Sequence, residues 1–320
     1  MLTRTIDHFR KERKETVVSA CKLFGASRQV YYRDNRSRLK KQEIAKEVVD
    51  MVLDIRKQMP RLGTRKLYYL LKDRLRELKV GRDKLFAIMA ANHLDIKPSR
   101  SYRVTTNSHH RFHKHNDLVS NLPLTRPEQV WVSDITYVGN RENHRYLALV
   151  TDAYSKKIVG HDLSDSLTTE GTLRALTMAV KQRIYKKEPL IHHSDRGLQY
   201  CSNEYQKLLE TKMIKCSMTE SYDPCANAVA ERVNGILKGE FLLEQYRVDL
   251  AIMKMLVKNS IEIYNTKRPH YSCYMKTPQE MHKQRKINIR TYKKINGNDY
   301  VFAPIYKNQY LYPIKPVSVF

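Results

Sequence analysis

The spacing of hydrophobic and polar positions changes near Pro127. Before it, apolar residues recur three and four positions apart, as in "TVVSACKLFGASRQVYYR", which is typical of amphipathic helices. After it, "QVWVSDITYV" alternates with the period of two that a half-buried strand requires. The pattern therefore predicts a helical N-terminal third followed by a mixed α/β region.

Residues 1–45 are expected to form a helix-turn-helix-like DNA-binding segment. A first helix ends near Gly25, and Ser27 is placed to cap a second, short helix. In this arrangement Arg28 and Arg33 would lie on the second helix and contact DNA. An ordinary helical hairpin with a solvated face is the alternative.

Residues 46–96 are expected to form a small bundle of three amphipathic helices, and Arg65 in "GTRKLYYLL" is a further candidate for DNA contact. Residues 97–127 are polar, basic and proline-flanked, so they are expected to be a linker. They include "HHRFHKH" at 109–115. No cysteine pair follows it at zinc-finger spacing, and a solvated linker is favoured over a zinc site.

Residues 128–285 are expected to form an α/β domain. Three runs, "QVWVSDITYV", "HRYLALVTDAY" and "KKIVGHDLSD", predict antiparallel strands, with a hairpin at the "GN" after the first. "PLIHHSD" and "IKCSMT" predict two further strands, and "ANAVAERVNGILKGEFLLEQY" predicts a long helix before another at residues 249–265. This order predicts a mixed sheet with helices on its faces. Residues 286–320 are expected to be a C-terminal extension.

Basic residues dominate the composition. Lysine and arginine outnumber aspartate and glutamate by 59 to 33, for a formal net charge of +26, and residues 1–116 hold 29 of the basic but only 12 of the acidic ones. Such an excess favours nucleic acid as partner, ahead of an anionic membrane surface. No apolar stretch approaches the roughly 18 residues that span a bilayer, and the charged N-terminus lacks a signal-peptide core. The expected location is the cytoplasm, in association with the nucleoid, and no membrane partner is expected.

Three carboxylates occupy positions that suit a metal site. Asp134 lies inside the first predicted strand, Asp195 ends the fourth, and Glu231 lies within the long helix. Alternation puts Val132 and Thr136 on the face of Asp134. Mixed sheets of this kind bring the middle of the first strand beside the end of the fourth. Each acid alone has an ordinary reading, as a strand-end aspartate or a solvated helical glutamate, so the case rests on the three together.

The residues around these acids resemble a known family. The stretches "WVSDITY", "HSDRGLQYCS", "NAVAERVNGILKGE" and "YNTKRPHYSCYMKTP" are similar to the integrase core of DDE transposases of the IS-three insertion-sequence family, in particular its second-reading-frame product. That core is related to retroviral integrases. The 35 residues between Asp195 and Glu231 match the spacing of the family. The likeness covers about residues 125–285. The stretches "VSACKLFGASRQVYYR" and "RLGTRKLYYLL" also resemble the family's upstream segment, so the match runs over most of the chain.

The resemblance implies an RNase H-like mixed-sheet catalytic core preceded by a small all-α DNA-binding region. It implies that three acids are both catalytic and metal-binding: Asp134, Asp195 and Glu231. The implied cofactor is a pair of Mg²⁺ ions, for which Mn²⁺ would substitute, because two ions about 3.5–4 Å apart can clamp the attacking and leaving oxygens of a phosphoryl transfer.

Neighbouring residues are expected to assist. Lys238 follows Glu231 by two helical turns, so it lies on the same face and can reach DNA near the cut. Arg196 is expected to position a phosphate, and Gly197 to permit a tight exit from the strand that ends at Asp195. Two residues are expected to lie next to the metal ligands and support them without binding the metal: His193 and Asn227.

The expected function is therefore that of a transposase. Water would cut one strand at the end of an insertion sequence, and the freed 3′-hydroxyl would attack a phosphodiester in target DNA or in the other end of the element. The expected partners are double-stranded DNA, both the terminal inverted repeats and the target, a second copy of the chain or a larger oligomer, and an upstream-frame protein.

Two alternatives stay open: an RNase H-like nuclease without strand transfer, and a non-catalytic DNA-binding repressor. The repressor is kept by one departure from the family pattern, since Cys225 and Ala226 stand where tyrosine and aspartate are usual.

Overall fold

The chain divides into two compact units, Met1–Lys97 and Pro98–Phe320, each described here by itself. The computed structural model describes residues 2–97, 115–120, 122–140, 144–219 and 228–287, and the backbone of 292–295 and 299–302. Within these residues no helix is both long and apolar enough to cross a membrane.

The N-terminal unit is built only of helices in its described part. Their bounds are α1 Leu2–Arg13, α2 Val17–Leu23, α3 Arg28–Gln58, α4 Thr64–Leu70, α5 Lys72–Glu77 and α6 Arg82–Ala91. The chain leaves α2 through Gly25, whose φ of +64° favours glycine. Ser27 then caps α3 by accepting a hydrogen bond from the Val30 backbone N–H. The turn and cap expected from the sequence are both present.

Helix α3 is longer than expected, because it continues past the boundary that the sequence predicted at residues 45 and 46. It runs for 31 residues, so the short helix expected after Ser27 and the helix expected to follow residue 46 are one helix. No glycine or proline occurs between Ser27 and Pro60, so nothing in the backbone interrupts the hydrogen bonding. The expected boundary at residues 45 and 46 therefore falls inside a continuous helix.

Two small cores stabilise the ends of α3. At its start, Ile6, Ala20, Cys21 and Tyr31 form one buried cluster. At its end, apolar side chains from α3, α4 and α6 are buried: Val48, Val52, Leu67, Leu85 and Met89. The three-helix bundle expected for this region is thus present, except that its middle helix is split at Leu71 into α4 and α5.

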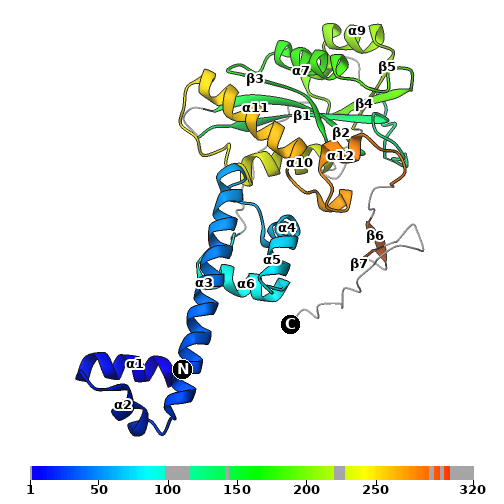
Figure 1. Cartoon of the computed structure of the whole chain (residues 1–320). Helices are drawn as coiled ribbons and strands as arrows, with labels where there is room; N and C mark the ends of the chain where they lie inside the picture. The colour runs from blue at the N-terminus through cyan, green and yellow to red at the C-terminus, as the bar shows by residue number, and fades with distance from the viewer. Residues whose placement is uncertain are drawn as a thin grey trace. The chain divides into compact units, whose positions relative to one another are not determined.

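The C-terminal unit contains a five-stranded mixed sheet of strand order β3-β2-β1-β4-β5 (Figure 1). Its strands are β1 Val130–Val138, β2 Arg145–Asp152, β3 Ile158–Ser164, β4 Leu190–Ser194 and β5 Ile214–Met218. Strands β1, β2 and β3 are mutually antiparallel, whereas β4 pairs in parallel with β1 and with β5. This is the strand order of an RNase H-like fold, and it confirms the predicted fold class.

Helices cover both faces of this sheet, with α7 and α9 on one side and α10 and α11 on the other (Figure 1). Their bounds are α7 Thr169–Lys181, α8 Leu198–Cys201, α9 Asn203–Thr211, α10 Ala228–Gly239, α11 Leu250–Thr266 and α12 Pro278–His282. Trp131 and Leu176 belong to the core on the α7 side. Val132 packs with Ala230 of α10 on the opposite side. The alternation predicted along β1 is therefore correct.

The segment before β1 corrects a second expectation. Within the linker expected at 97–127, residues 98–114, which hold most of the histidine cluster, lie outside the described part. Residues after them pack on the sheet: the Leu118 backbone N–H donates to Ser217 Oγ over 2.9 Å. Three apolar side chains of the segment join the α10-side core: Val119, Leu122 and Leu124. The polar composition of the segment concealed these apolar positions.

A short hairpin, β6 Tyr292–Ile295 and β7 Asp299–Phe302, lies in the expected C-terminal extension.

A buried polar cluster ties α12 to the entry of β1. Glu128, Asp152 and His282 are each at most 1 % exposed. His282 Nδ1 lies 2.9 Å from Ser155 Oγ, which in turn donates to Asp152 Oδ1 over 2.6 Å. His282 Nε2 lies 3.4 Å from Glu128 Oε1. The cluster therefore joins three segments that are far apart in the sequence.

Pairing outweighs burial in this cluster. Burial alone would lower the pKa of His282, but its contacts with Asp152 and Glu128 raise it above the ordinary value. Burial would likewise raise the pKa of Glu128 and Asp152, but His282 and the hydrogen bonds they accept lower both. The contacts of His282 with the two carboxylates stabilise the folded state. This stabilisation is lost as pH rises through the raised pKa of His282, and also as pH falls through the lowered pKa values of Glu128 and Asp152.

Replacing His282 by alanine is expected to lower the free energy of unfolding of the C-terminal unit by about 3–5 kcal/mol at pH 7, because two buried carboxylates lose their partner. Trp131, the single tryptophan, is fully buried in this unit, so its fluorescence during urea denaturation reports the loss. His144→Ala, at an exposed position, is the matched control, with a change of about 0.5 kcal/mol or less. An equally small change in His282→Ala would contradict the proposed pairing.

Candidate active site

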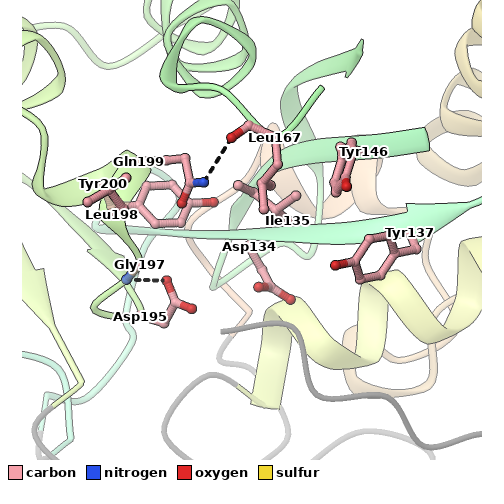
Figure 2. A pocket seen from close by; sticks show the side chains of 10 residues that line it. All are labelled: Asp134, Ile135, Tyr137, Tyr146, Leu167, Asp195, Gly197, Leu198, Gln199 and Tyr200. Carbon is pink, nitrogen blue, oxygen red and sulfur yellow. Dashed lines mark hydrogen bonds between the residues drawn. The ribbon is translucent and has the colours of Figure 1, made fainter. Parts of the chain in front are cut away.

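The parallel pairing of β1 with β4 places two acids side by side. The register aligns Val132 with His193, and two further residues along each strand bring Asp134 beside Asp195. Neighbouring strands lie about 4.8 Å apart, so these side chains share one site. Figure 2 shows both carboxyl groups on the same side of the β1 ribbon. The convergence expected from the sequence is present for this pair.

Hydrogen bonds between strands hold that register. Ser133 Oγ lies 2.7 Å from Nε2 of His192, and the same nitrogen lies 2.9 Å from the Tyr205 hydroxyl on α9. Burial lowers the pKa of His192 to about 3, so the ring is neutral. The imidazole therefore links β1, β4 and α9 without adding a charge near the acids. Sequence periodicity gave no signal for this role.

Helix α10 brings a third group of side chains to Asp134. Asn234 Nδ2 donates to Asp134 Oδ2 over 2.7 Å. Glu231 and Lys238 lie three residues before and four residues after Asn234, on the same helical face. Asn234 was not among the expected residues, although the helical spacing that identified Lys238 applies to it equally.

Burial and neighbouring charges shift the pKa of Asp134. Burial first, and then the negative charges of Asp195 and Glu231, raise the pKa of Asp134 to about 7. The positive charge of Lys238 acts in the opposite direction. Partial burial also raises the pKa of Glu231. Three carboxyl groups therefore repel one another here, and this repulsion is what a bound cation would relieve.

The donor chemistry fits a hard divalent cation, which takes oxygen ligands from few carboxylates and from substrate phosphates. Among the described residues, however, no three histidine, cysteine, aspartate or glutamate side chains are already grouped closely enough to hold a metal. Asp134 and Asp195 form the close pair, whereas Glu231 is exposed in the first turn of α10. A complete ligand set would need Glu231 to approach the pair.

The exit from β4 has a different cause from the one expected. Gly197 has a φ of −66°, which any residue adopts, so backbone freedom is not the reason for glycine here. Its backbone N–H donates to Asp195 Oδ1 over 3.1 Å. A Cβ atom at this position would lie 3.0 Å from that oxygen. Glycine therefore leaves room for the Asp195 carboxyl.

The remaining candidates are placed as follows. His193 is buried, and its Nδ1 lies 2.9 Å from Ser217 Oγ on β5. Arg196 is half-buried next to Asp195. Arg28, Arg33 and Arg65 are exposed on helices of the N-terminal unit. Asn227, Cys225 and Ala226 lie outside the described residues.

A cavity of about 290 Å³ adjoins the acid pair. It lies along the part of β1 that follows Val132, the last residue of β1 that pairs with β4. Its described lining is shown in Figure 2: Asp134, Ile135, Tyr137, Tyr146, Leu167, Asp195, Gly197, Leu198, Gln199 and Tyr200.

Comparisons with known proteins agree with this geometry. Two families described as integrase core domain match residues 125–224 and 212–278. The IS600 31 kDa protein of Shigella sonnei is 35% identical over 259 residues, which cover 78% of this chain and 92% of that protein. Transposase InsF of insertion sequence IS3fB from Escherichia coli is 33% identical over 195 residues, which cover 60% of this chain and 67% of that protein.

Solved structures match the chain at lower identity. The HTLV-2 integrase catalytic core domain is 21% identical and covers 49% of this chain and 97% of its own, with a TM-score of 0.39. A simian T-cell lymphotropic virus intasome chain is 18% identical and covers 74% of this chain and 81% of its own, with a TM-score of 0.45.

The core of the chain is thus that of a DDE polynucleotidyl transferase. The chain belongs to the IS-three (IS3) family of insertion-sequence transposases.

Replacing Asp134 by asparagine is expected to stabilise the cation-free protein by about 1–2 kcal/mol at pH 8, since it removes one charge from a repelling group. The sign follows from the pKa, which is raised from 3.8 to about 7 on folding, so that wild-type stability falls as pH rises through this interval. Urea denaturation in EDTA at pH 8 and pH 4 measures the difference, which should vanish at pH 4. Equal stability of the two proteins at pH 8 would show that the carboxylates do not repel.

Proposed function

We propose that the chain cuts DNA at the ends of an insertion sequence and joins the freed ends to target DNA. The observation that carries the proposal is the β1–β4 register that sets Asp134 beside Asp195. In the first step, water forms a bond to the scissile phosphorus and the 3′ oxygen leaves as a hydroxyl. In the second, that hydroxyl attacks a target phosphodiester and displaces its 3′ oxygen. Neither step needs a nucleophile from the protein.

Asp134, Asp195 and Glu231 would hold two Mg²⁺ ions, with Mn²⁺ as a substitute. Such ions supply a lowered pKa for the attacking oxygen and charge neutralisation for the transferred phosphate. Asn234 keeps the Asp134 carboxyl oriented through its 2.7 Å hydrogen bond. Lys238 faces the acids from the same helix, where it would bind a phosphate of the DNA strand near the cut.

The N-terminal unit would bind the terminal inverted repeats. Ser27 starts α3 so that Arg28 and Arg33 lie exposed in its first two turns. Arg65 is exposed in the first turn of α4. Arginines at helix starts can contact phosphates and base edges in DNA. Arg196 would position a phosphate of the DNA, and two residues would support the metal ligands: His193 and Asn227.

Two element ends must be brought together for joining, so a homodimer or larger oligomer on DNA is part of the proposal. An upstream-frame protein is a further proposed partner.

Asp195→Asn is expected to bind DNA that carries an element end with wild-type affinity but to yield no nicked or joined product. The assay uses labelled duplexes taken from the DNA that flanks the gene, with and without Mg²⁺. Glu210→Gln, at an exposed position on α9, is the matched control and should react normally. Joined product from Asp195→Asn would contradict the proposal. Cutting without joining by the wild-type protein would indicate the nuclease alternative. Identical behaviour of the wild-type protein and both variants would indicate the repressor alternative.

Arg28→Ala and Arg33→Ala are each expected to weaken end-DNA binding and to reduce the slope of log affinity against log salt by about 1, because each removes one phosphate contact. Fluorescence anisotropy over a salt series measures this slope. Lys57→Ala provides the control, because Lys57 is exposed in the same unit but its ammonium is paired with Asp54 at 2.7 Å. Unchanged slopes for both arginine variants would place the DNA surface elsewhere.

A further inference from the structure

The cavity beside the acids has a second part of different chemistry. Away from Asp134 and Asp195, five apolar or aromatic side chains line it, and we call this part the aromatic recess: Tyr137, Tyr146, Leu167, Leu198 and Tyr200. None of the described residues that line the cavity is lysine, arginine or histidine. The described lining of the recess therefore holds no lysine or arginine that would bind a phosphate.

Strands β1 and β2 fix two of its rings. Tyr137 and Tyr146 are directly opposed across the antiparallel pair, with ring centroids 5.2 Å apart and planes tilted by 53°. Both side chains are half-buried, so each keeps ring surface that a ligand can cover. Because they stand on sheet strands, the rings are held in place before any ligand arrives.

Two leucines and a tyrosine complete the recess. Leu167 and Leu198 are 39% and 46% exposed, which places apolar surface next to a charged site. Tyr200 is only 2% exposed, and its hydroxyl has no hydrogen-bond partner among the residues that the structure describes. Burial, together with nearby charges that include Asp134 and Asp195, raises the pKa of Tyr200 well above its ordinary value, so the hydroxyl keeps its proton. It remains a donor at the wall of the recess.

The charge of the site limits what can fill this space. The two aspartates repel phosphates unless cations intervene, and no lysine or arginine lies in the described lining of the recess. A ligand of the recess must therefore be neutral, planar and attached to the phosphate that the aspartates act on. The nucleobase next to that phosphate meets all three conditions. Bases stack on tyrosine rings, and their edges can accept a hydrogen bond from a hydroxyl or bond to an amide such as that of Gln199.

We propose that the aromatic recess binds one nucleobase, unstacked from the duplex next to the phosphate being cut. This inference rests on the proposed DNA cleavage and names the part of the substrate that the cavity takes. Unstacking a base costs free energy, and stacking on Tyr137 and Tyr146 returns part of it. A cavity of about 290 Å³ is large enough for a single base.

The test couples the recess to the base. Joining rates are measured for the full chain with Mg²⁺ on two duplexes from the flanking DNA, one intact and one with an abasic nucleotide next to the cut. On intact DNA, Tyr137→Ala is expected to join about tenfold more slowly than wild type, because ring stacking is lost. On abasic DNA the two proteins should differ by about twofold or less, since there is no base to bind. Tyr137→Phe keeps the ring, so its loss on intact DNA should be clearly smaller than that of Tyr137→Ala.

Two further variants separate a binding role from a folding defect. Leu198→Ala lies at an exposed position and should show the same dependence on the base, with a smaller loss. Tyr271→Ala, which removes an exposed ring outside the cavity, should join both duplexes normally. The inference would be overturned if Tyr137→Ala lost the same factor in joining rate on intact and abasic DNA. It would also be overturned if neither Tyr137→Ala nor Leu198→Ala joined intact DNA more slowly than wild type. Both results would leave the proposed function intact. Failure of the wild-type protein to join intact DNA would instead reject the proposed function.

Discussion

The parallel pairing of β1 with β4 is the contact on which the site depends. A shift of one residue in this register would turn Asp134 or Asp195 to the opposite face of the sheet and separate them. Ser133 and His192 oppose such a shift, because they bond across the same two strands over 2.7 Å. The apolar core on the α7 side excludes water from this bond and keeps the imidazole neutral. The sheet thus stabilises an arrangement that the charges alone would disfavour.

Electrostatic strain at the acids is the second feature that links fold to function. The fold brings Asp134, Asp195 and Glu231 near enough for their charges to raise the pKa of Asp134 to about 7, and it supplies Asn234 and Lys238 in partial compensation. Groups held in such a state favour the binding of a cation over its absence. Glu231 is exposed on α10, and its approach to the two aspartates would complete the set of three carboxylates.

Much of this was predictable from the sequence, and the exceptions have physical reasons. Hydrophobic patterning placed the five strands, and motif spacing singled out three acids, of which the fold sets Asp134 and Asp195 side by side. Local patterns did not reveal the length of α3, because its continuity depends on an absence of breakers over 31 residues. They also missed the hydrogen bond of Asn234, which depends on an aspartate from a distant strand, although the helical spacing that singled out Lys238 applies to Asn234 equally. The space needed at Gly197 depends on where the carboxyl group of Asp195, two residues earlier, lies in the folded chain. Side-chain partners across the sheet come from tertiary packing, which a single sequence does not encode locally.

The most direct test of the shared acid site is the position of a bound cation. Anomalous diffraction from crystals of the protein grown with Mn²⁺ locates the ion independently of any assay. If the two aspartates share one site, a single peak should lie about 2.0–2.6 Å from a carboxyl oxygen of Asp134 and also from a carboxyl oxygen of Asp195. A cation bound elsewhere, or one that contacts a single aspartate while the other carboxyl turns away, would contradict it.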